Sequence, residues 1–243
     1  MKTKRLISAP QTLQSLLAKL PNPLETTNRV FDLSNEKEYW LHAHIIKRIG
    51  DLIMIKEFRN FEVDRHNQKI LRFLLLYFNQ DKQSEEVFPE EEYKIHKPIM
   101  LLGNGGKTLL MQIFAQYLRM TGNPNAFFNV SITEMTNYFK INNHLDKYTF
   151  NELTSGKKFS GNPVNLCLND LGLKKHMHFE VDTKTLTDDF LYARYELFVN
   201  HGKKTHLTTS LDVTELKNVF EKQLTDCFKS YNIINVGGES RRK

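Results

Sequence analysis

A glycine-rich turn followed by lysine and threonine is the stretch of this sequence best suited to chemistry. The turn, residues 103–106, comes directly after an apolar run at residues 99–102. Lys107 and Thr108 then open a segment whose apolar residues recur at helical spacing. A strand, a glycine turn, Lys-Thr and a helix form the phosphate cradle of a P-loop, in which backbone N–H groups point inward and the helix N-terminus adds partial positive charge. The phosphate-binding residues expected here are Gly103, Asn104, Gly105, Gly106, Lys107 and Thr108.

The turn is two residues shorter than the P-loop pattern requires. That pattern, G-x-x-x-x-G-K-[ST], places four residues between its glycines, whereas only Asn104 and Gly105 separate Gly103 from Gly106. A plain glycine turn that joins a strand to a helix is therefore an alternative. The dinucleotide fingerprint G-x-G-x-x-G is rejected, because its third glycine and its ribose-binding acid are both missing.

A polar pair that ends a second apolar run supplies the next candidate residues. Residues 165–168 lead into Asn169 and Asp170. In phosphoryl transfer at a P-loop, Lys107 would reach the β and γ phosphates, Thr108 would hold Mg²⁺, and an acidic pair would complete the metal shell and polarise water. We therefore expect Thr108 and Asn169 at the metal and Asp170 as the base. Because an amide brings no negative charge, Mg²⁺ binding should be weakened, and an ordinary turn after the strand is the alternative.

Length and composition limit the kinds of protein that could contain such a site. With 243 residues, 40% hydrophobic and 26% charged, the chain can build one sizeable core and a small appendage. Its net charge of +6 suits a polyanionic partner. Two cysteines without a CxxC motif argue against a disulfide framework or zinc site. No apolar run approaches the ~18 residues of a membrane span, and no signal-peptide pattern follows the basic start, so we expect a cytoplasmic protein without membrane contact.

Short segments of apolar and branched residues are predicted to be strands, and helices alternate with them. The strands are expected at about residues 99, 127, 165, 205 and 232. This alternation predicts a parallel sheet with helices on both faces. Ligands of such sheets bind at the carboxyl ends of the strands, where the Gly-Lys-Thr, Asn-Asp and Thr-Thr-Ser groups all fall.

Capping residues indicate where the helices begin. The expected caps, in chain order, are Ser34, Asp64, Thr133 and the capping-box pair Asp212 and Glu215. The expected helices cover about residues 35–56, a segment after residue 64, 133–140, 185–200 and 219–230. Gly202 is predicted to stop the fourth of these helices.

These motifs together resemble the DnaC/IstB-like branch of AAA+ ATPases, the helicase loaders and transposition helpers. The similarity covers roughly residues 58–243. It depends on Leu-Leu-Gly-Asn-Gly-Gly-Lys-Thr, Leu-Cys-Leu-Asn-Asp-Leu-Gly, Arg194-Tyr-Glu-Leu-Phe, Thr205-His-Leu-Thr-Thr-Ser-Leu and Gly238-Glu-Ser-Arg-Arg. The resemblance implies an α/β P-loop NTPase fold of the ASCE type, with a parallel five-stranded sheet flanked by helices and a helical N-terminal extension at residues 1–57. It also implies ATP and Mg²⁺ as cofactors, a homo-oligomer, and a replicative helicase or transposase with single-stranded DNA as partners.

The resemblance assigns roles to particular positions, and several of them depart from the family pattern. The implied positions are Lys107 and Thr108 (Walker A), Asn169 and Asp170 (Walker B), Ser210 (sensor asparagine) and Arg242 or Arg241 (C-terminal sensor arginine). Gln223 and Cys227 stand where the family has the arginine given to a neighbouring subunit. Such an arginine contributes about 10³–10⁵ in rate in other NTPases, so we expect hydrolysis to be weak.

Two functions of different class follow from these expectations. The first is an ATP-binding AAA+ protein that couples nucleotide state to DNA or helicase binding. The alternative is a nucleotide-independent scaffold or adaptor in a phage or mobile-element system for replication or transposition. In the alternative, residues 1–33, which carry leucines at helical spacing within residues 13–20, would bind a partner. Docking of this segment on the protein's own core, or partial disorder, is favoured over that role.

Basic residues mixed with aromatic ones give a weaker indication of DNA contact. Single-stranded nucleic acid binds where bases stack on aromatic rings inside a basic groove. The candidate DNA-binding residues are Lys140, Lys157 and Lys158, with Tyr138, Phe139 and Lys147 near them in the sequence. A solvated surface is the favoured alternative for this group.

Overall fold

The computed structural model describes residues 30–149, 163–172, 177–178 and 181–237. A five-stranded sheet with the strand order β2-β3-β6-β1-β7 forms its centre, and all neighbouring strands are parallel. The strands are β1 (Ile99–Leu102), β2 (Phe127–Ser131), β3 (Asn165–Leu171), β6 (Thr205–Thr209) and β7 (Asn232–Asn235). The expected fold class, a parallel five-stranded α/β sheet flanked by helices with a helix before it, is confirmed.

Helices occupy the connections between the strands. The α-helices are α2 (Glu36–Met54), α3 (Gln68–Phe78), α4 (Lys107–Met120), α5 (Ile132–Asn142), α6 (Asp146–Thr149), α7 (Thr183–His201), α8 (Val213–Val219) and α9 (Lys222–Phe228). Two 3₁₀ turns are η1 (Ile55–Glu57) and η2 (Lys82–Glu86). A small antiparallel pair, β4 (Met177–His178) and β5 (Val181–Asp182), precedes α7. Within the part of the chain that the structure describes, no helix is long and apolar enough to cross a membrane.

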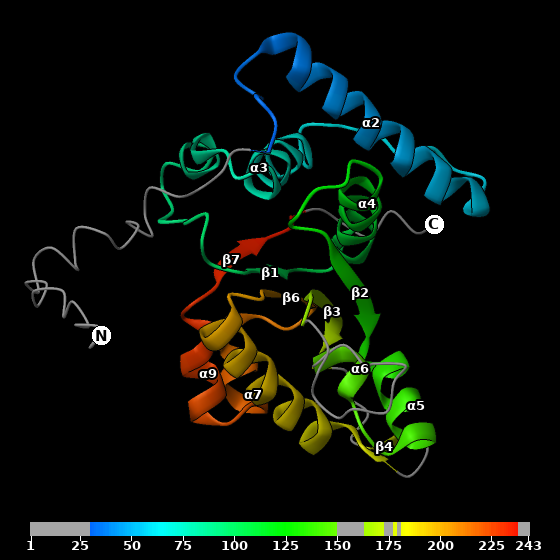
Figure 1. Cartoon of the computed structure of the whole chain (residues 1–243), viewed down its shortest axis with the longest axis vertical. Coiled ribbons are helices and arrows are strands. Elements are labelled where there is room, and N and C mark those ends of the chain that lie inside the picture. Colours follow the sequence, from blue (N-terminus) through cyan, green and yellow to red (C-terminus); the bar gives the residue numbers. More distant parts are fainter. Residues whose placement is uncertain (1–29, 150–162, 173–176, 179–180, 238–243) are drawn as a thin grey trace, which may run out of the picture.

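Two hydrophobic clusters hold the sheet between layers of helices (Figure 1). The helices α2, α3 and α4 cover one face, and α5, α7, α8 and α9 cover the other. Along β1, Ile99 and Leu101 belong to the first cluster, whereas Met100 and Leu102 belong to the second, as the alternation of side chains in a strand requires. A strand that is buried on both faces appears in sequence as an unbroken apolar run, which is why this strand was predictable.

The N-terminal caps of α2 and α3 differ from the predicted ones. Asn35, not Ser34, caps α2, because its side chain accepts the backbone N–H of Lys37 at 3.0 Å. Asn67 stands at the cap position of α3, whereas Asp64 accepts two backbone N–H groups in the turn before that helix. Both predicted caps stand beside other residues that can cap a helix, and the packing of each helix decides which of them is used.

The cap of α5 is also misplaced in the prediction, while the capping box of α8 is confirmed. Ser131 rather than Thr133 caps α5 and accepts the backbone N–H of Glu134 at 3.0 Å. At α8, Asp212 accepts the Glu215 N–H at 2.7 Å, and the Glu215 carboxylate accepts the Asp212 N–H at 2.9 Å. This reciprocal pair needs only local geometry, so its sequence signature is reliable.

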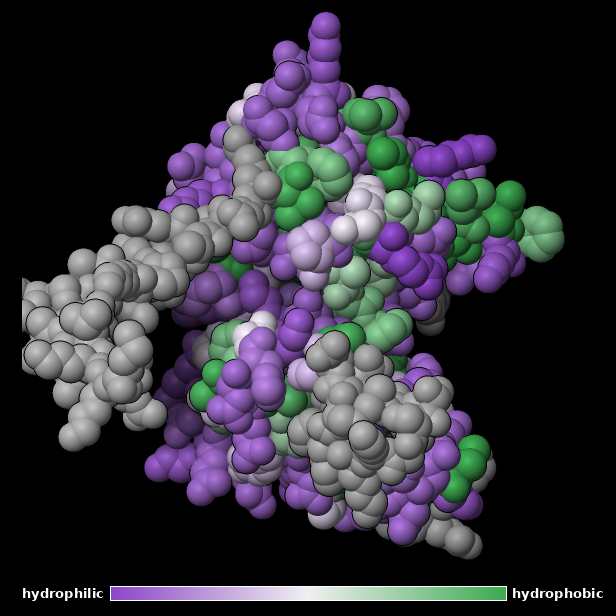
Figure 2. Space-filling model, in the orientation of Figure 1, coloured by the Kyte–Doolittle hydropathy of each residue, from purple (hydrophilic) through white to green (hydrophobic). Residues whose placement is uncertain are grey.

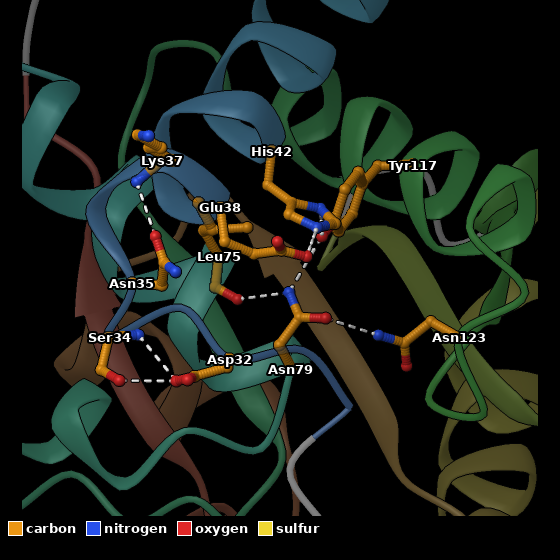
Figure 3. A network of polar contacts seen from close by, with 10 residues as sticks. All are labelled: Asp32, Ser34, Asn35, Lys37, Glu38, His42, Leu75, Asn79, Tyr117 and Asn123. Atoms are coloured by element: carbon orange, nitrogen blue, oxygen red, sulfur yellow. Dashed lines mark hydrogen bonds and ion pairs between the residues drawn. The ribbon is translucent and has the colours of Figure 1, made fainter.

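A buried chain of hydrogen bonds ties α2 to α3 and α4 (Figure 3). The Tyr117 hydroxyl accepts from Nδ2 of Asn79 at 3.0 Å and shares a hydrogen bond of 2.7 Å with Nδ1 of His42. Asn79 in turn accepts from Nδ2 of Asn123 at 2.9 Å. His42 is therefore buried and hydrogen-bonded within this network. The division of the chain after residue 57 stays a prediction, although α2 packs in the same hydrophobic cluster as α3 and α4.

Candidate functional site

Glycine residues shape the turn between β1 and α4. Gly103 has a φ of 111° and Gly106, the N-cap of α4, has a φ of 74°. Residues other than glycine rarely adopt these φ values. A Cβ at Gly103 would lie 2.5 Å from the carbonyl oxygen of Val236, so no larger residue fits there. The turn brings the N-terminus of α4, with its unpaired N–H groups, to the carboxyl edge of the sheet.

Lys107 begins α4 and is almost completely buried. Its Nζ donates a hydrogen bond to the carbonyl oxygen of Gly103, at the opposite end of the turn. Burial lowers the pKa of Lys107, and the negative charge of Asp170 opposes that effect. The ammonium group is thus held at the closure of the turn and within the field of the Asp170 carboxylate.

A bulge at the end of β3 sets the position of Asp170. In the pairing of β3 with β6, Leu168 lies opposite Leu207 but Leu171 lies opposite Thr209, so β3 carries an extra residue. Asp170 has a φ of 63°, in the left-handed region that few residues other than glycine adopt. Bulges of this kind redirect side chains beside functional sites, and Asp170 here lines the same cavity as the glycine turn.

Asn169, the residue before it, points into the protein and not into the cavity. It is buried, and its Nδ2 donates to Oδ1 of Asn129 at 3.1 Å. Its Oδ1 accepts from the Thr208 hydroxyl at 3.2 Å, and that hydroxyl also accepts the backbone N–H of Asp170 at 3.1 Å. Both ends of the Asn169 amide are therefore engaged in hydrogen bonds within the sheet.

A cavity of about 660 Å³ lies over the glycine turn. One wall is the turn with the start of α4, Asp170 and the end of β7, and the other wall is the end of α2 with the segment that leads to α3. Its polar and charged lining includes Asn104, Lys107, Thr108, Asp170, Glu57, Arg59, Asn60, Glu62, His66 and Asn67. The volume falls within the range of about 300–1,000 Å³ that small-molecule sites occupy.

The structure brings together some of the predicted site residues and separates others. Asn104, Gly105, Gly106, Lys107, Thr108 and Asp170 line the cavity. Gly103 forms the start of the turn, and Asn169 lies behind Asp170 within the sheet. Ser210 follows the end of β6 and is exposed, and it is not among the cavity-lining residues. Arg242, Arg241, Lys157 and Lys158 lie outside the described residues, and Lys140 is exposed on α5, away from the cavity.

Two residues that support the site were not singled out from the sequence. Thr208 is fully buried and holds both Asn169 and Asp170 through one hydroxyl. Asn129 on β2 binds the other end of the Asn169 amide. The sequence does place Thr208 inside the Thr-Thr-Ser group at a strand end, but nothing in it pairs that threonine with Asn169, which lies 39 positions away.

No family model and no curated protein matches this chain. Among solved structures, AMPPCP-bound DnaA from Aquifex aeolicus is similar, with a TM-score of 0.45 and 15% identity over 72% of this chain and 48% of that chain. This chain thus spans under half the length of that protein. Its own sheet order and the glycine turn after β1 make it an α/β protein with a parallel five-stranded sheet and a glycine turn at the carboxyl ends of the strands.

Proposed function

We propose that this protein binds ATP in the cavity over the glycine turn and hydrolyses it weakly, as an AAA+ protein resembling the helicase loaders. The observation that carries the proposal is the convergence of the turn, Lys107, Thr108 and Asp170 on one cavity of about 660 Å³. An anion is stabilised there by the Lys107 ammonium and by the N-terminus of the 14-residue helix α4. A homo-oligomer, and coupling to single-stranded DNA and to a replicative helicase or transposase, belong to the same proposal.

Weak hydrolysis follows from what surrounds the phosphate position. Asp170 is the acid at the carboxyl end of β3, and its neighbour Asn169 is a neutral amide turned into the sheet. Gln223 and Cys227 lie on α9 in place of the arginine that the family resemblance implies. In other NTPases such groups stabilise the transition state rather than the bound nucleotide, so binding persists when they are altered.

The test is the binding of labelled ATP by the full chain and by Lys107→Ala. Removing a charge-assisted contact to phosphate costs about 1.5–3 kcal/mol, so affinity should fall roughly 10- to 100-fold. Lys217→Ala, which removes an exposed lysine on α8, is the matched control and should bind like the wild type. Absence of ATP binding by the wild type, or equal binding by Lys107→Ala, would contradict the proposal.

A nucleotide-independent adaptor is the second candidate function, and the outer surface of α2 favours it. Large apolar side chains are exposed near the end of this helix, where Figure 2 shows hydrophobic surface. They include Leu52, Ile55 and Phe58, of which Phe58 is 97% exposed and has a φ of 54°. Exposed apolar groups gathered in this way are typical of protein-binding surfaces.

The adaptor is tested by pull-down of the replicative helicase or transposase of the same genetic system with Ile55→Ser/Phe58→Ser. We expect loss of the captured partner, because replacing both apolar side chains removes most of the hydrophobic contact area. Val199→Ser, at an exposed apolar residue of α7, is the control and should retain capture. Undiminished capture by the double variant would contradict the adaptor hypothesis and would not bear on the proposal of ATP binding.

A further inference from the structure

We infer that Arg59, on the wall of the cavity opposite the glycine turn, is a second contact to the phosphates of the bound nucleotide. This inference rests on the proposed function and adds a residue that neither the motifs nor the family resemblance assigns. In the described part of the chain, Arg59 and Lys107 are the arginine and lysine side chains that line the cavity. They belong to different walls, so a ligand between the walls has a positively charged side chain on each side.

The way α2 ends directs Arg59 toward the cavity. Phe58 has a φ of 54°, in the left-handed region, and its N–H donates to the Ile55 carbonyl oxygen at 3.0 Å. The N–H of Arg59 donates to the Met54 carbonyl oxygen at 3.3 Å. These two bonds form the Schellman motif, which usually has glycine at the left-handed position. Phe58 and Arg59 consequently lie on opposite sides of the chain, the first almost fully exposed and the second lining the cavity.

The next residues attach this wall of the cavity to α2. The Phe61 N–H donates to Oδ1 of Asp51 at 2.9 Å, and Asp51 also pairs with Nζ of Lys47 at 2.8 Å. The buried Phe61 ring packs against Gly50, where a Cβ would lie 2.5 Å from the ring. The backbone that carries Arg59 is therefore held on both sides of that residue. Such preorganisation lowers the entropy cost of ordering a side chain on a ligand.

The Arg59 side chain can exchange its partner for a phosphate at little cost. Its Nη1 lies 3.6 Å from Oε2 of Glu57, in a largely exposed pair of the kind that contributes little to stability. A guanidinium group matches the geometry of phosphate oxygens and keeps its charge at all ordinary pH values. Glu57 lines the same wall, so its carboxylate opposes a phosphate there, and its removal should favour binding.

The glycine-turn side of the cavity offers limited positive charge for a triphosphate. It has the Lys107 ammonium and the N-terminus of α4, which is equivalent to roughly half a charge. Thr108 and Asp170 line that side and, with phosphate oxygens and water, suit a Mg²⁺ ion. The helix α9 carries no arginine for a neighbouring subunit. Arg59 adds positive charge from the other wall of the same chain.

The experiment measures the binding of labelled ATP to the full chain in a buffer with Mg²⁺ at constant ionic strength. Arg59→Gln should bind ATP about 5- to 20-fold more weakly, because it loses a charge-assisted contact that is partly screened by solvent. Glu57→Gln should bind about 2- to 5-fold more tightly, because it removes a negative charge from the same wall. Arg119→Gln, at an exposed arginine near the end of α4, is the matched control and should bind like the wild type.

Competition by inorganic tripolyphosphate shows which part of the nucleotide Arg59 contacts. Tripolyphosphate has the phosphate chain of ATP without its sugar and base. If Arg59 contacts the phosphates, Arg59→Gln should weaken tripolyphosphate binding by about the same factor as ATP binding. A contact to the sugar or base would leave the competition unchanged.

The possible results separate this inference from the proposed function. Equal ATP binding by Arg59→Gln and the wild type, weaker binding by Glu57→Gln, or equal competition by tripolyphosphate in Arg59→Gln and the wild type overturns the arginine contact and leaves ATP binding standing. Absence of ATP binding by the wild type overturns both. Weaker binding of both ATP and tripolyphosphate by Arg59→Gln, with Arg119→Gln unchanged, supports both.

Discussion

At the scale of single residues, the candidate site depends on the hydroxyl of Thr208, whose partners on β3 the sequence does not reveal. The Thr208 side chain accepts the Asp170 N–H and donates to the Asn169 carbonyl oxygen, so it fixes the bulge in which both residues lie. A β-bulge leaves backbone groups without their usual partners in the ladder, and this hydroxyl satisfies one of them. Asn129 completes the same network from the neighbouring strand.

Thr208→Val should therefore destabilise the protein although it keeps the shape of the side chain. It leaves the Asp170 N–H without its acceptor and leaves Oδ1 of Asn169 with only the weak Cys167 thiol donor at 3.6 Å, which costs about 1–3 kcal/mol of unfolding free energy. Urea denaturation measures this change. Thr214→Val, at an exposed position of α8, is the control and should stay within about 0.5 kcal/mol of the wild type. Equal stability of Thr208→Val and the wild type would show that the hydroxyl does not hold the bulge.

At the scale of elements, buried polar side chains join helices to the sheet on both of its faces. Arg194 on α7 is 1% exposed and donates to the Thr205 hydroxyl at 2.7 Å. Its other nitrogen atoms donate to the carbonyl oxygens of Tyr148, Val164 and Lys204 at 2.9–3.2 Å. The sequence motif that contains Arg194 therefore has a structural role here, because it attaches α7 to the starts of β3 and β6. On the opposite face, the Tyr117 network joins α2 to the helices α3 and α4 rather than to the sheet.

At the scale of the whole molecule, the polar groups at the carboxyl ends of the strands differ in exposure from those at the amino ends. The carboxyl edge carries the cavity with its charged lining, whereas the amino edge encloses polar groups inside the core. There, Nζ of Lys204 donates to the Ile95 carbonyl oxygen at 2.6 Å, and Nδ1 of His206 accepts the Ile99 N–H at 3.1 Å. Burial lowers the pKa of Lys204 to about 7. Burial, then the charges of Lys204 and Arg194, lower the pKa of His206 well below its ordinary value.

Acidification should consequently destabilise the fold. Both groups have a folded pKa below the unfolded one, so the unfolded chain binds more protons and the unfolding free energy falls as the pH falls. For Lys204 the loss runs from its ordinary pKa of 10.5 down to about 7, and for His206 it continues below 6.5. Urea denaturation at several pH values measures this slope.

The variant that isolates the lysine is Lys204→Met. It should flatten the pH dependence of stability between about pH 7 and pH 10, because the group that gains a proton on unfolding is gone. Lys217→Met, at the exposed lysine of α8, should keep the wild-type slope. A slope that is the same in Lys204→Met and the wild type would show that Lys204 is not the titrating group.

Elements that depend on short-range physics were predicted well. The apolar run of β1, the capping box of α8 and the stop of α7 at Gly202, which has a φ of 65°, all appear where the sequence places them. The caps of α2, α3 and α5 were misplaced by one to three residues, because each stands among several residues of similar capping strength.

The sequence by itself determined the parallel sheet, the glycine turn after β1 and the set of polar groups at one edge, because each depends on residue type and periodicity along the chain. Only the tertiary structure decided that Asp170 faces the cavity while Asn169 faces away from it. That outcome depends on a bulge and on hydrogen bonds to Asn129 and Thr208, which are 40 and 39 positions distant. Pairing between strands so far apart in the chain is set by the packing of the whole core, and no local pattern encodes it.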